Sequence, residues 1–184
     1  MGFKISWIGF SGIGKADVLS RLGLAESGQI EEVPESPFSG IEIPGGWYVV
    51  FANDFLFVNN FESEPPAKLG GYSRECRLVA CQVHEGVMTS VAYGYDRGRP
   101  IWRIMHDAQQ GIYDFTVSGT PPAEFEAIRA RLTEEQDSKG GKSSDVDYIF
   151  DVPVEVAYAL TGFRHDMWRY DWGNPVFMRL EPAR

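Results

Sequence analysis

The sequence is poor in cysteine, and its two cysteines, Cys76 and Cys81, lie five residues apart. In a β-strand this odd spacing would place them on opposite faces, so they could not bridge each other. Neither a C-x-x-C pair nor a zinc-ligand spacing occurs, which leaves no sequence signal for a structural metal site. Unpaired thiols are typical of reducing compartments, so we expect a cytoplasmic protein.

Basic residues and long apolar runs are also scarce. The chain has 17 Lys and Arg against 26 Asp and Glu, and its formal net charge is -9. So acidic a chain repels phosphate backbones and anionic headgroups, which excludes nucleic acid and membrane surfaces as expected partners. No stretch approaches the roughly 20 apolar residues of a membrane-spanning helix. A basic protein partner would suit this charge. The alternative is that the acidic residues serve only to keep the protein soluble.

Hydrophobic residues make up 43 % of the 184 residues and aromatic residues 14 %, which is a globular composition. This length is enough for one domain with a sizeable core. The sequence has no internal repeat and no shift in composition that would mark a boundary. We therefore expect a single domain over residues 1–184.

Closely spaced apolar segments between residues 76 and 119 predict successive strands separated by Gly-containing turns. Such strands have to pair antiparallel, because a parallel crossover needs a dozen or more residues. The Asp96-Arg97-Gly98 sequence predicts the turn of a hairpin. Further strands are expected at residues 3–10, 41–43, 47–52 and 174–182.

The helical spacing of apolar residues predicts three helices, which begin near residues 15, 120 and 151. Thr120 and Asp151 can cap the second and third helices, and Pro121 is tolerated at a first helical position. Gly23 and Gly162 are natural stops for the first and third. The expected inward residues are Val18, Leu19 and Leu22, then Phe125, Ile128 and Leu132, then Val152, Val156, Ala159 and Leu160.

Three segments are expected to be largely irregular. Residues 25–40 carry four glutamates and two prolines, which predicts an acidic irregular connection. Residues 61–73 are expected to hold at most one short helix, after Pro66. Residues 134–146 are expected to form a flexible loop. Because the expected strands cluster and do not alternate with helices, the fold class is α+β. We expect a largely antiparallel, or mixed, sheet with about three helices packed on it.

Residues 9–15, G-F-S-G-I-G-K, match the G-x-x-x-x-G-K core of a phosphate-binding loop. A strand precedes them and a helix follows, so Gly14 and Lys15 are candidate cofactor-binding residues. Against this, residue 16 is alanine, where the motif needs a hydroxyl on Mg²⁺, and such loops belong to parallel sheets. We favour a strand-to-helix turn with a lysine in the first helical turn, and expect no cofactor.

The three histidines are His84, His106 and His165, and the last two precede Asp107 and Asp166. The order His84, His106-Asp107, Asp166 resembles the H…HD…D metal ligands of the HD-type phosphohydrolases, which are helical enzymes. In this sequence His84 and His106 fall in expected strands, and no spacing selects a metal, so none is expected. His106, Asp107, His165 and Asp166 are the catalytic candidates. Under the alternative interpretation, His106 bonds a carboxylate or carbonyl at the core edge, and the aspartates accept local N–H bonds.

The acidic run Asp145, Asp147 and Asp151 lacks the ligand spacing and terminal Glu of a calcium loop. We interpret it as a solvated loop that leads into a helix cap.

Aromatic and charged residues alternate in residues 163–175, F-R-H-D-M-W-R-Y-D-W-G-N-P. In a strand, Trp168, Tyr170 and Trp172 would share one face. That face would belong either to the core or to a recognition surface, since Trp, Tyr and Arg are common interface anchors.

The sequence thus predicts a non-catalytic interaction module that binds a basic protein, in the manner of immunity or antitoxin proteins. This analogy rests on the general character of such proteins, which are small and acidic and have no catalytic motif, and not on a shared sequence motif. The expected contact residues are Glu31, Glu32 and Glu35 together with Trp168, Tyr170 and Trp172. The alternative is a small hydrolase or nucleotide-handling enzyme that uses the His-Asp pairs or residues 9–15.

Overall fold

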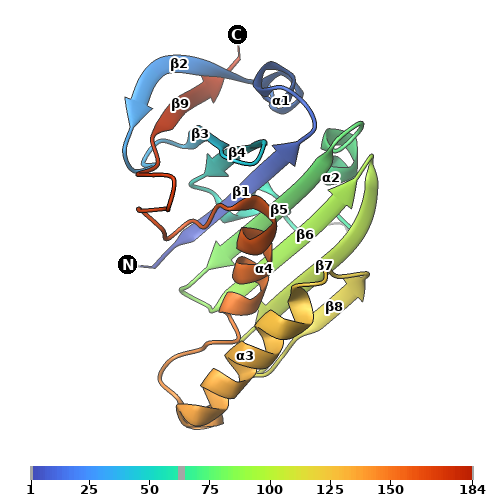
Figure 1. The fold of residues 1–184 in the computed structure, drawn as a ribbon, viewed down its shortest axis with the longest axis vertical. Helices are drawn as coiled ribbons and strands as arrows, with labels where there is room; N and C mark the ends of the chain where they lie inside the picture. The colour runs from blue at the N-terminus through green and yellow to red at the C-terminus, as the bar shows by residue number, and fades with distance from the viewer. Residues whose placement is uncertain (1, 62–64, 184) are drawn as a thin grey trace.

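The computed structural model describes residues 2–61 and 65–183, which form one antiparallel sheet of nine strands with helices packed on it (Figure 1). The predicted α+β class and largely antiparallel sheet are confirmed. The strands are β1 (Lys4–Ser11), β2 (Leu24–Glu31), β3 (Phe38–Ile43), β4 (Trp47–Ala52), β5 (Arg77–His84), β6 (Thr89–Asp96), β7 (Arg99–Asp107), β8 (Thr116–Gly119) and β9 (Phe177–Pro182). Their order across the sheet is β2-β9-β3-β4-β1-β5-β6-β7-β8.

The helices are α1 (Lys15–Leu22), α2 (Ala67–Tyr72), α3 (Phe125–Ser138) and α4 (Asp151–Thr161), with short 3-10 turns η1 (Phe55–Phe57) and η2 (Gly141–Ser143). Gly23 and Gly162 end α1 and α4 in the left-handed conformation, with φ of 66° and 74°, as the sequence predicts. Among the helices of the described residues, none is long and apolar enough to cross a membrane.

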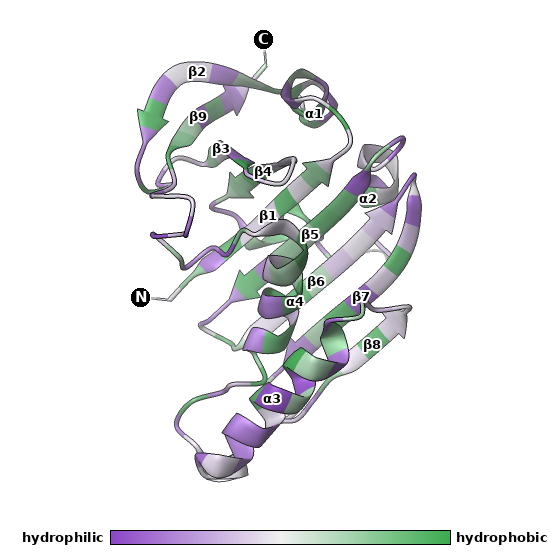
Figure 2. Cartoon of the chain, in the orientation of Figure 1, coloured by the Kyte–Doolittle hydropathy of each residue, from purple (hydrophilic) through white to green (hydrophobic). Residues whose placement is uncertain are grey.

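The sheet separates two hydrophobic clusters. Along β1, Ile5 and Trp7 belong to one cluster, whereas Ile8 and Phe10 belong to the other. Helix α4 covers β5, β6 and β7 on the first face, and α3 packs beside α4 (Figure 1). Helices α1 and α2 contribute to the second cluster. The central strands β1, β4, β5 and β6 are therefore buried on both faces, and Figure 2 shows hydrophobic residues interspersed with more polar ones along them.

Residues 24–31 form the edge strand β2, and β3 begins at Phe38, so the prediction of an irregular connection over residues 25–40 is wrong at both ends. Strand β2 pairs with β9, from Leu24 opposite Pro182 to Glu31 opposite Phe177. The register shifts between Glu26 and Ile30, around Gly28, whose φ is 78°. A bulge of this kind weakens the local strand pattern.

Two of the helix predictions also need correction. Helix α3 begins only at Phe125, so Thr120 does not cap it and Pro121 is not its first residue. The N–H of Thr120 donates to the carbonyl of Ile101 (2.8 Å). Helix α3 then runs to Ser138, so it takes up the first part of the loop expected over residues 134–146. In α4, Ala159 is exposed and not inward as expected. Helix α2 follows Pro66 as predicted, while residues 62–64 of the expected break lie outside the described residues.

Candidate functional site

The segment that resembles a phosphate-binding loop connects β1 to α1. Strand β1 pairs antiparallel with both β4 and β5, unlike the parallel setting of a true phosphate-binding loop. Lys15 Nζ lies 2.8 Å from Glu26 Oε1 and 3.8 Å from Glu42 Oε1. The hydrogen bond to Glu26 raises the pKa of Lys15, so the ammonium stays charged and paired with carboxylates. Gly14 precedes the helix in an extended conformation, and Lys15 faces acidic side chains.

The sheet register keeps the histidines from forming one site. His106 pairs with Ser90, and Ser90 pairs with Val83, so His106 shares a face with Val83. His84 follows Val83 in β5 and therefore points to the opposite face. His165 packs edge-on against Phe3, with ring centroids 4.9 Å apart. The part of the chain that the structure describes contains no group of three or more His, Cys, Asp or Glu side chains able to hold a metal ion.

His106 is completely buried and uses both ring nitrogens. Nδ1 lies 2.7 Å from the carbonyl oxygen of Asp114, and Nε2 lies 2.7 Å from Asp147 Oδ2. Burial lowers the pKa of His106, but the bonds to Asp147 and Asp114 outweigh it, and the net pKa is raised. This matches the structural interpretation of His106. It corrects the prediction for Asp147, whose side chain is only 8 % exposed and is no part of a solvated loop.

In the second His-Asp pair, Asp166 binds the half-buried Arg164. Arg164 binds Asp166 through Nε (2.7 Å) and Asp151 through Nη2 (2.9 Å), so Asp151 serves this ion pair and does not cap α4. Burial lowers the pKa of His165 to about 4, which keeps its imidazole neutral. In the first pair, Asp107 accepts hydrogen bonds from Thr89 and Gln109, as expected for a turn residue.

Residues 163–176 do not form a strand, so the alternation of aromatic and charged residues there does not define the two faces of one. Tyr170 and Gly173 close an isolated bridge, and the Tyr170 hydroxyl donates to the carbonyl of Arg164. Tyr170 is buried, whereas Trp168 and Trp172 are 41 % and 37 % exposed, so the three rings do not all belong to the core. The Trp172 ring stacks on Tyr170 at a centroid distance of 4.6 Å, which holds an exposed indole in place.

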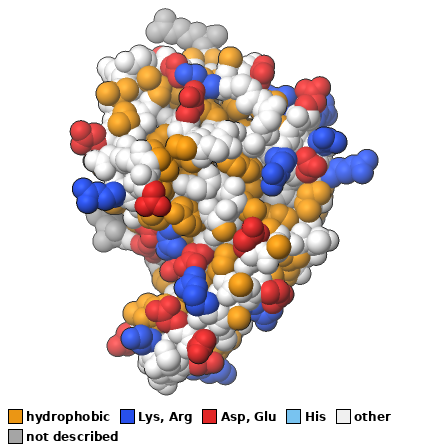
Figure 3. Space-filling model, in the orientation of Figure 1, with side chains coloured by type: hydrophobic (Ala, Val, Ile, Leu, Met, Phe, Trp, Pro, Cys, Tyr) orange, Lys and Arg blue, Asp and Glu red, His pale blue; other side chains and the backbone are white. Residues whose placement is uncertain are grey.

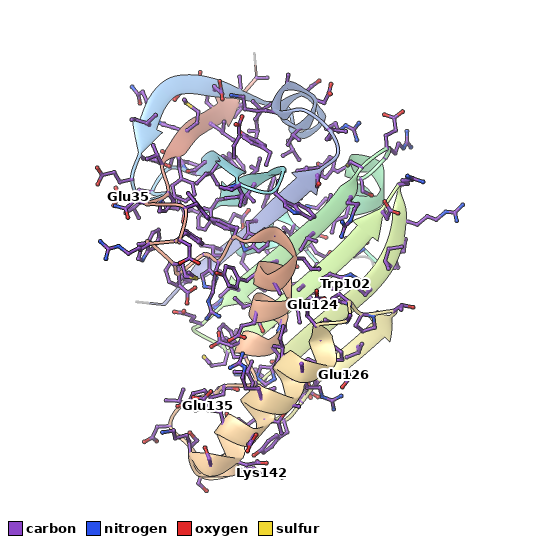
Figure 4. All side chains as sticks on the ribbon, viewed as in Figure 1. Glu35, Trp102, Glu124, Glu126, Glu135 and Lys142 are labelled. Atoms are coloured by element: carbon purple, nitrogen blue, oxygen red, sulfur yellow. The ribbon has the colours of Figure 1, made fainter. Side chains whose placement is uncertain are left out.

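The three predicted acidic contact residues lie at the end of β2 and beyond it. Glu31 accepts hydrogen bonds from the hydroxyls of Ser36 and Ser39, which gives it a structural role. Glu32 and Glu35 are exposed, and Figure 4 shows Glu35 at the margin of the molecule, in the connection between β2 and β3.

A groove of about 430 Å³ combines residues from several of these segments. It opens where β3 and β9 separate, because their pairing ends at Gly40 opposite Met178. Its lining includes the ion-paired Lys15, Trp172 and two strongly exposed apolar residues, Ile30 (71 % exposed) and Val176 (52 % exposed). The complete lining is Lys15, Glu26, Ile30, Gly40, Ile41, Glu42, Tyr48, Trp172, Asn174, Val176, Phe177 and Met178. We name it the β3–β9 groove.

The groove holds one polar group without a partner. Tyr48 is only 5 % exposed, and its hydroxyl has no hydrogen-bond partner among the described residues. The hydroxyl lies over Gly40, where a Cβ atom would stand 2.1 Å from it, so any larger residue at position 40 would displace the Tyr48 side chain. Burial raises the pKa of Tyr48, and the nearby Glu26 and Glu42 raise it further, so the hydroxyl keeps its proton.

Sequence reasoning singled out Lys15 and Trp172 separately, but it missed Gly40, Glu42 and Tyr48. Gly40 and Glu42 belong to β3 and Tyr48 belongs to β4, and the sequence pattern of these segments predicts only β-structure. Their connection to Trp172 depends on β9 lying beside β3, which no local pattern reveals. A comparison of the chain with protein-family models, curated proteins and solved structures found no match to any of them.

Proposed function

We propose that this protein is a non-catalytic interaction module that binds a basic protein through the β3–β9 groove. The observation that carries the proposal is the groove lining, in which the exposed residues Ile30, Trp172 and Val176 adjoin the carboxylates of Glu26 and Glu42. Exposed apolar side chains beside unbalanced charge are typical of a binding surface.

Electrostatics support a basic partner. The groove contains one lysine and two glutamates, and the whole chain has a formal net charge of -9. Figure 3 shows acidic and basic side chains mixed over the face that carries α3 and α4, so that face presents no extended surface of one sign. A cationic partner would be steered by the net charge and held by the groove.

An inhibitor of the immunity or antitoxin kind is the specific form of the proposal. Such a protein blocks a toxin by covering its active site, and a basic rim around that site would meet the acidic groove. A rigid aromatic anchor such as Trp172, stacked on Tyr170, would exclude water from the contact.

A capture experiment with charge-reversal variants tests the proposal. The tagged protein is exposed to a lysate of its source cells at low and high salt, and bound proteins are identified by mass spectrometry. We expect a basic partner that is lost at high salt and lost with Trp172→Ala and Glu42→Lys. Glu126→Lys, an equal charge reversal on α3 (Figure 4), is the matched control and should retain the partner.

Two results would contradict the proposal. One is that no protein is captured at either salt concentration. The other is that the groove variants and Glu126→Lys retain the same partner equally well, because a partner bound elsewhere would not distinguish them.

A further inference from the structure

We propose that the β3–β9 groove is a receptor for the ammonium group of a single lysine side chain of the basic partner. This inference rests on the proposed function and names the group that the groove recognises. It is carried by a feature independent of the acidic residues, the unpartnered hydroxyl of Tyr48.

The groove already shows how it holds an ammonium group. Lys15 Nζ sits between the carboxylates of Glu26 and Glu42, at 2.8 Å and 3.8 Å. The longer contact leaves Glu42, whose side chain is 73 % exposed, only weakly engaged. One lysine against two glutamates leaves one negative charge, and one further cation would balance it.

Tyr48 supplies the acceptor that distinguishes this groove from an exposed acidic patch. Its hydroxyl is buried and keeps its proton, so the free lone pairs of the oxygen can accept a bond from a cationic N–H. Tyr48 and Glu42 are directly opposite each other on β4 and β3, so their side chains point to the same face of the sheet. A buried hydroxyl without a partner is costly, and a ligand that supplies a donor to its oxygen lowers that cost.

The remaining walls suit the stem of a lysine. Ile30 and Val176 offer exposed apolar surface to methylene groups, and the indole of Trp172 can lie beside the stem or below the charge. The ammonium group is compact and carries three donors on a flexible chain. It can therefore bond Glu42 and Tyr48 together, whereas a planar guanidinium is suited to a bidentate contact with one carboxylate.

The test is a titration followed by the indole N–H resonance of Trp172 in an NMR spectrum. The probe is Nα-acetyl-lysine methylamide, with the norleucine and arginine derivatives as controls. We expect a saturable shift with the lysine derivative, no saturable shift with norleucine and weaker binding of arginine. Glu42→Gln and Tyr48→Phe should each weaken lysine binding by about tenfold, because each removes an acceptor for a charged donor. Glu126→Gln should bind like the wild type.

Tyr48→Phe is the decisive variant, because it removes an unpartnered hydroxyl and leaves the packed ring, so the fold is retained. The inference is overturned if the lysine derivative gives no saturable shift, if arginine binds as tightly, or if Tyr48→Phe binds like the wild type. The two proposals fail separately. If the probe does not bind but capture of a basic partner still requires Trp172, only the lysine assignment falls. If that capture fails as well, both fall.

Discussion

The buried pair of His106 and Asp147 makes a sharp prediction about stability, which Asp147→Asn tests. The His106 side chain is fully buried and that of Asp147 is 8 % exposed, with 2.7 Å between Nε2 and Oδ2. Removal of one partner from a buried ion pair costs about 3–5 kcal/mol. Because asparagine keeps the shape of the side chain, we expect the lower end, about 3 kcal/mol of unfolding free energy at acidic pH.

The pH dependence follows from the raised pKa of His106. The folded state holds this proton more tightly than the unfolded state, whose histidine has a pKa of about 6.5. The stabilisation is therefore complete below about pH 6.5 and is lost as the pH rises through the folded pKa. Above it, Nδ1–H still donates to the Asp114 carbonyl, which leaves Nε2 as an acceptor. An asparagine amide can donate to that nitrogen, so the cost of the substitution falls to below about 1 kcal/mol.

Urea unfolding of the wild type and of Asp147→Asn at about pH 5.5, 7.5 and 9.5 measures how the cost of the substitution changes with pH. Asp145→Asn, an exposed position in the same loop, is the matched control and should change the free energy by less than about 0.5 kcal/mol. His165 and the other titrating groups are the same in the wild type and in each variant, so their contributions cancel in the difference between the unfolding free energies. A cost that is equal for both variants at acidic pH, or that grows with pH, would refute the reasoning.

Two further predictions concern the core. Gly94→Ala should destabilise the protein by about 1–3 kcal/mol in thermal unfolding, because the new Cβ would stand 2.1 Å from Nε1 of Trp102. Gly71→Ala in α2 is the control and should be neutral or stabilising, because no atom lies within 4 Å of where its Cβ would stand. Equal effects would show that the Gly94 contact does not constrain the core. Both cysteines are buried and free, and burial raises the pKa of Cys81 to about 12, so neither thiol should react with a disulfide reagent at neutral pH until the protein unfolds. Rapid labelling of the native protein would contradict that expectation.

Sequence reasoning succeeded where neighbouring residues decide the structure. The hairpin at Asp96-Arg97-Gly98 joins β6 to β7 as predicted, because two close apolar segments and a turn specify their own pairing. The glycine stops of α1 and α4 are equally local, since Gly23 and Gly162 adopt the left-handed conformation that ends a helix.

The errors arose where distant residues decide. Strand β2 has a partner, β9, near the other end of the sequence, and its bulge at Gly28 disturbs the alternation that would have revealed a strand. Asp147 looks like a solvated loop residue until His106, which lies 41 positions earlier, is placed beside it. The groove likewise exists only after β9 lies next to β3, so neither Tyr48 nor Glu42 could be recognised from sequence.

The position of β9 between β2 and β3 has a consequence for the order of folding. Among the strands of the described residues, β2 pairs with β9 alone, so it cannot join the sheet until the chain has been synthesised as far as residues 177–182. Strands β3 to β7, in contrast, can begin to pair with neighbours that are already made. Contacts of such long sequence separation form slowly, because a large loop has to close first. We therefore expect the groove to be assembled late in folding, and a chain released before β9 would present an unfinished sheet edge.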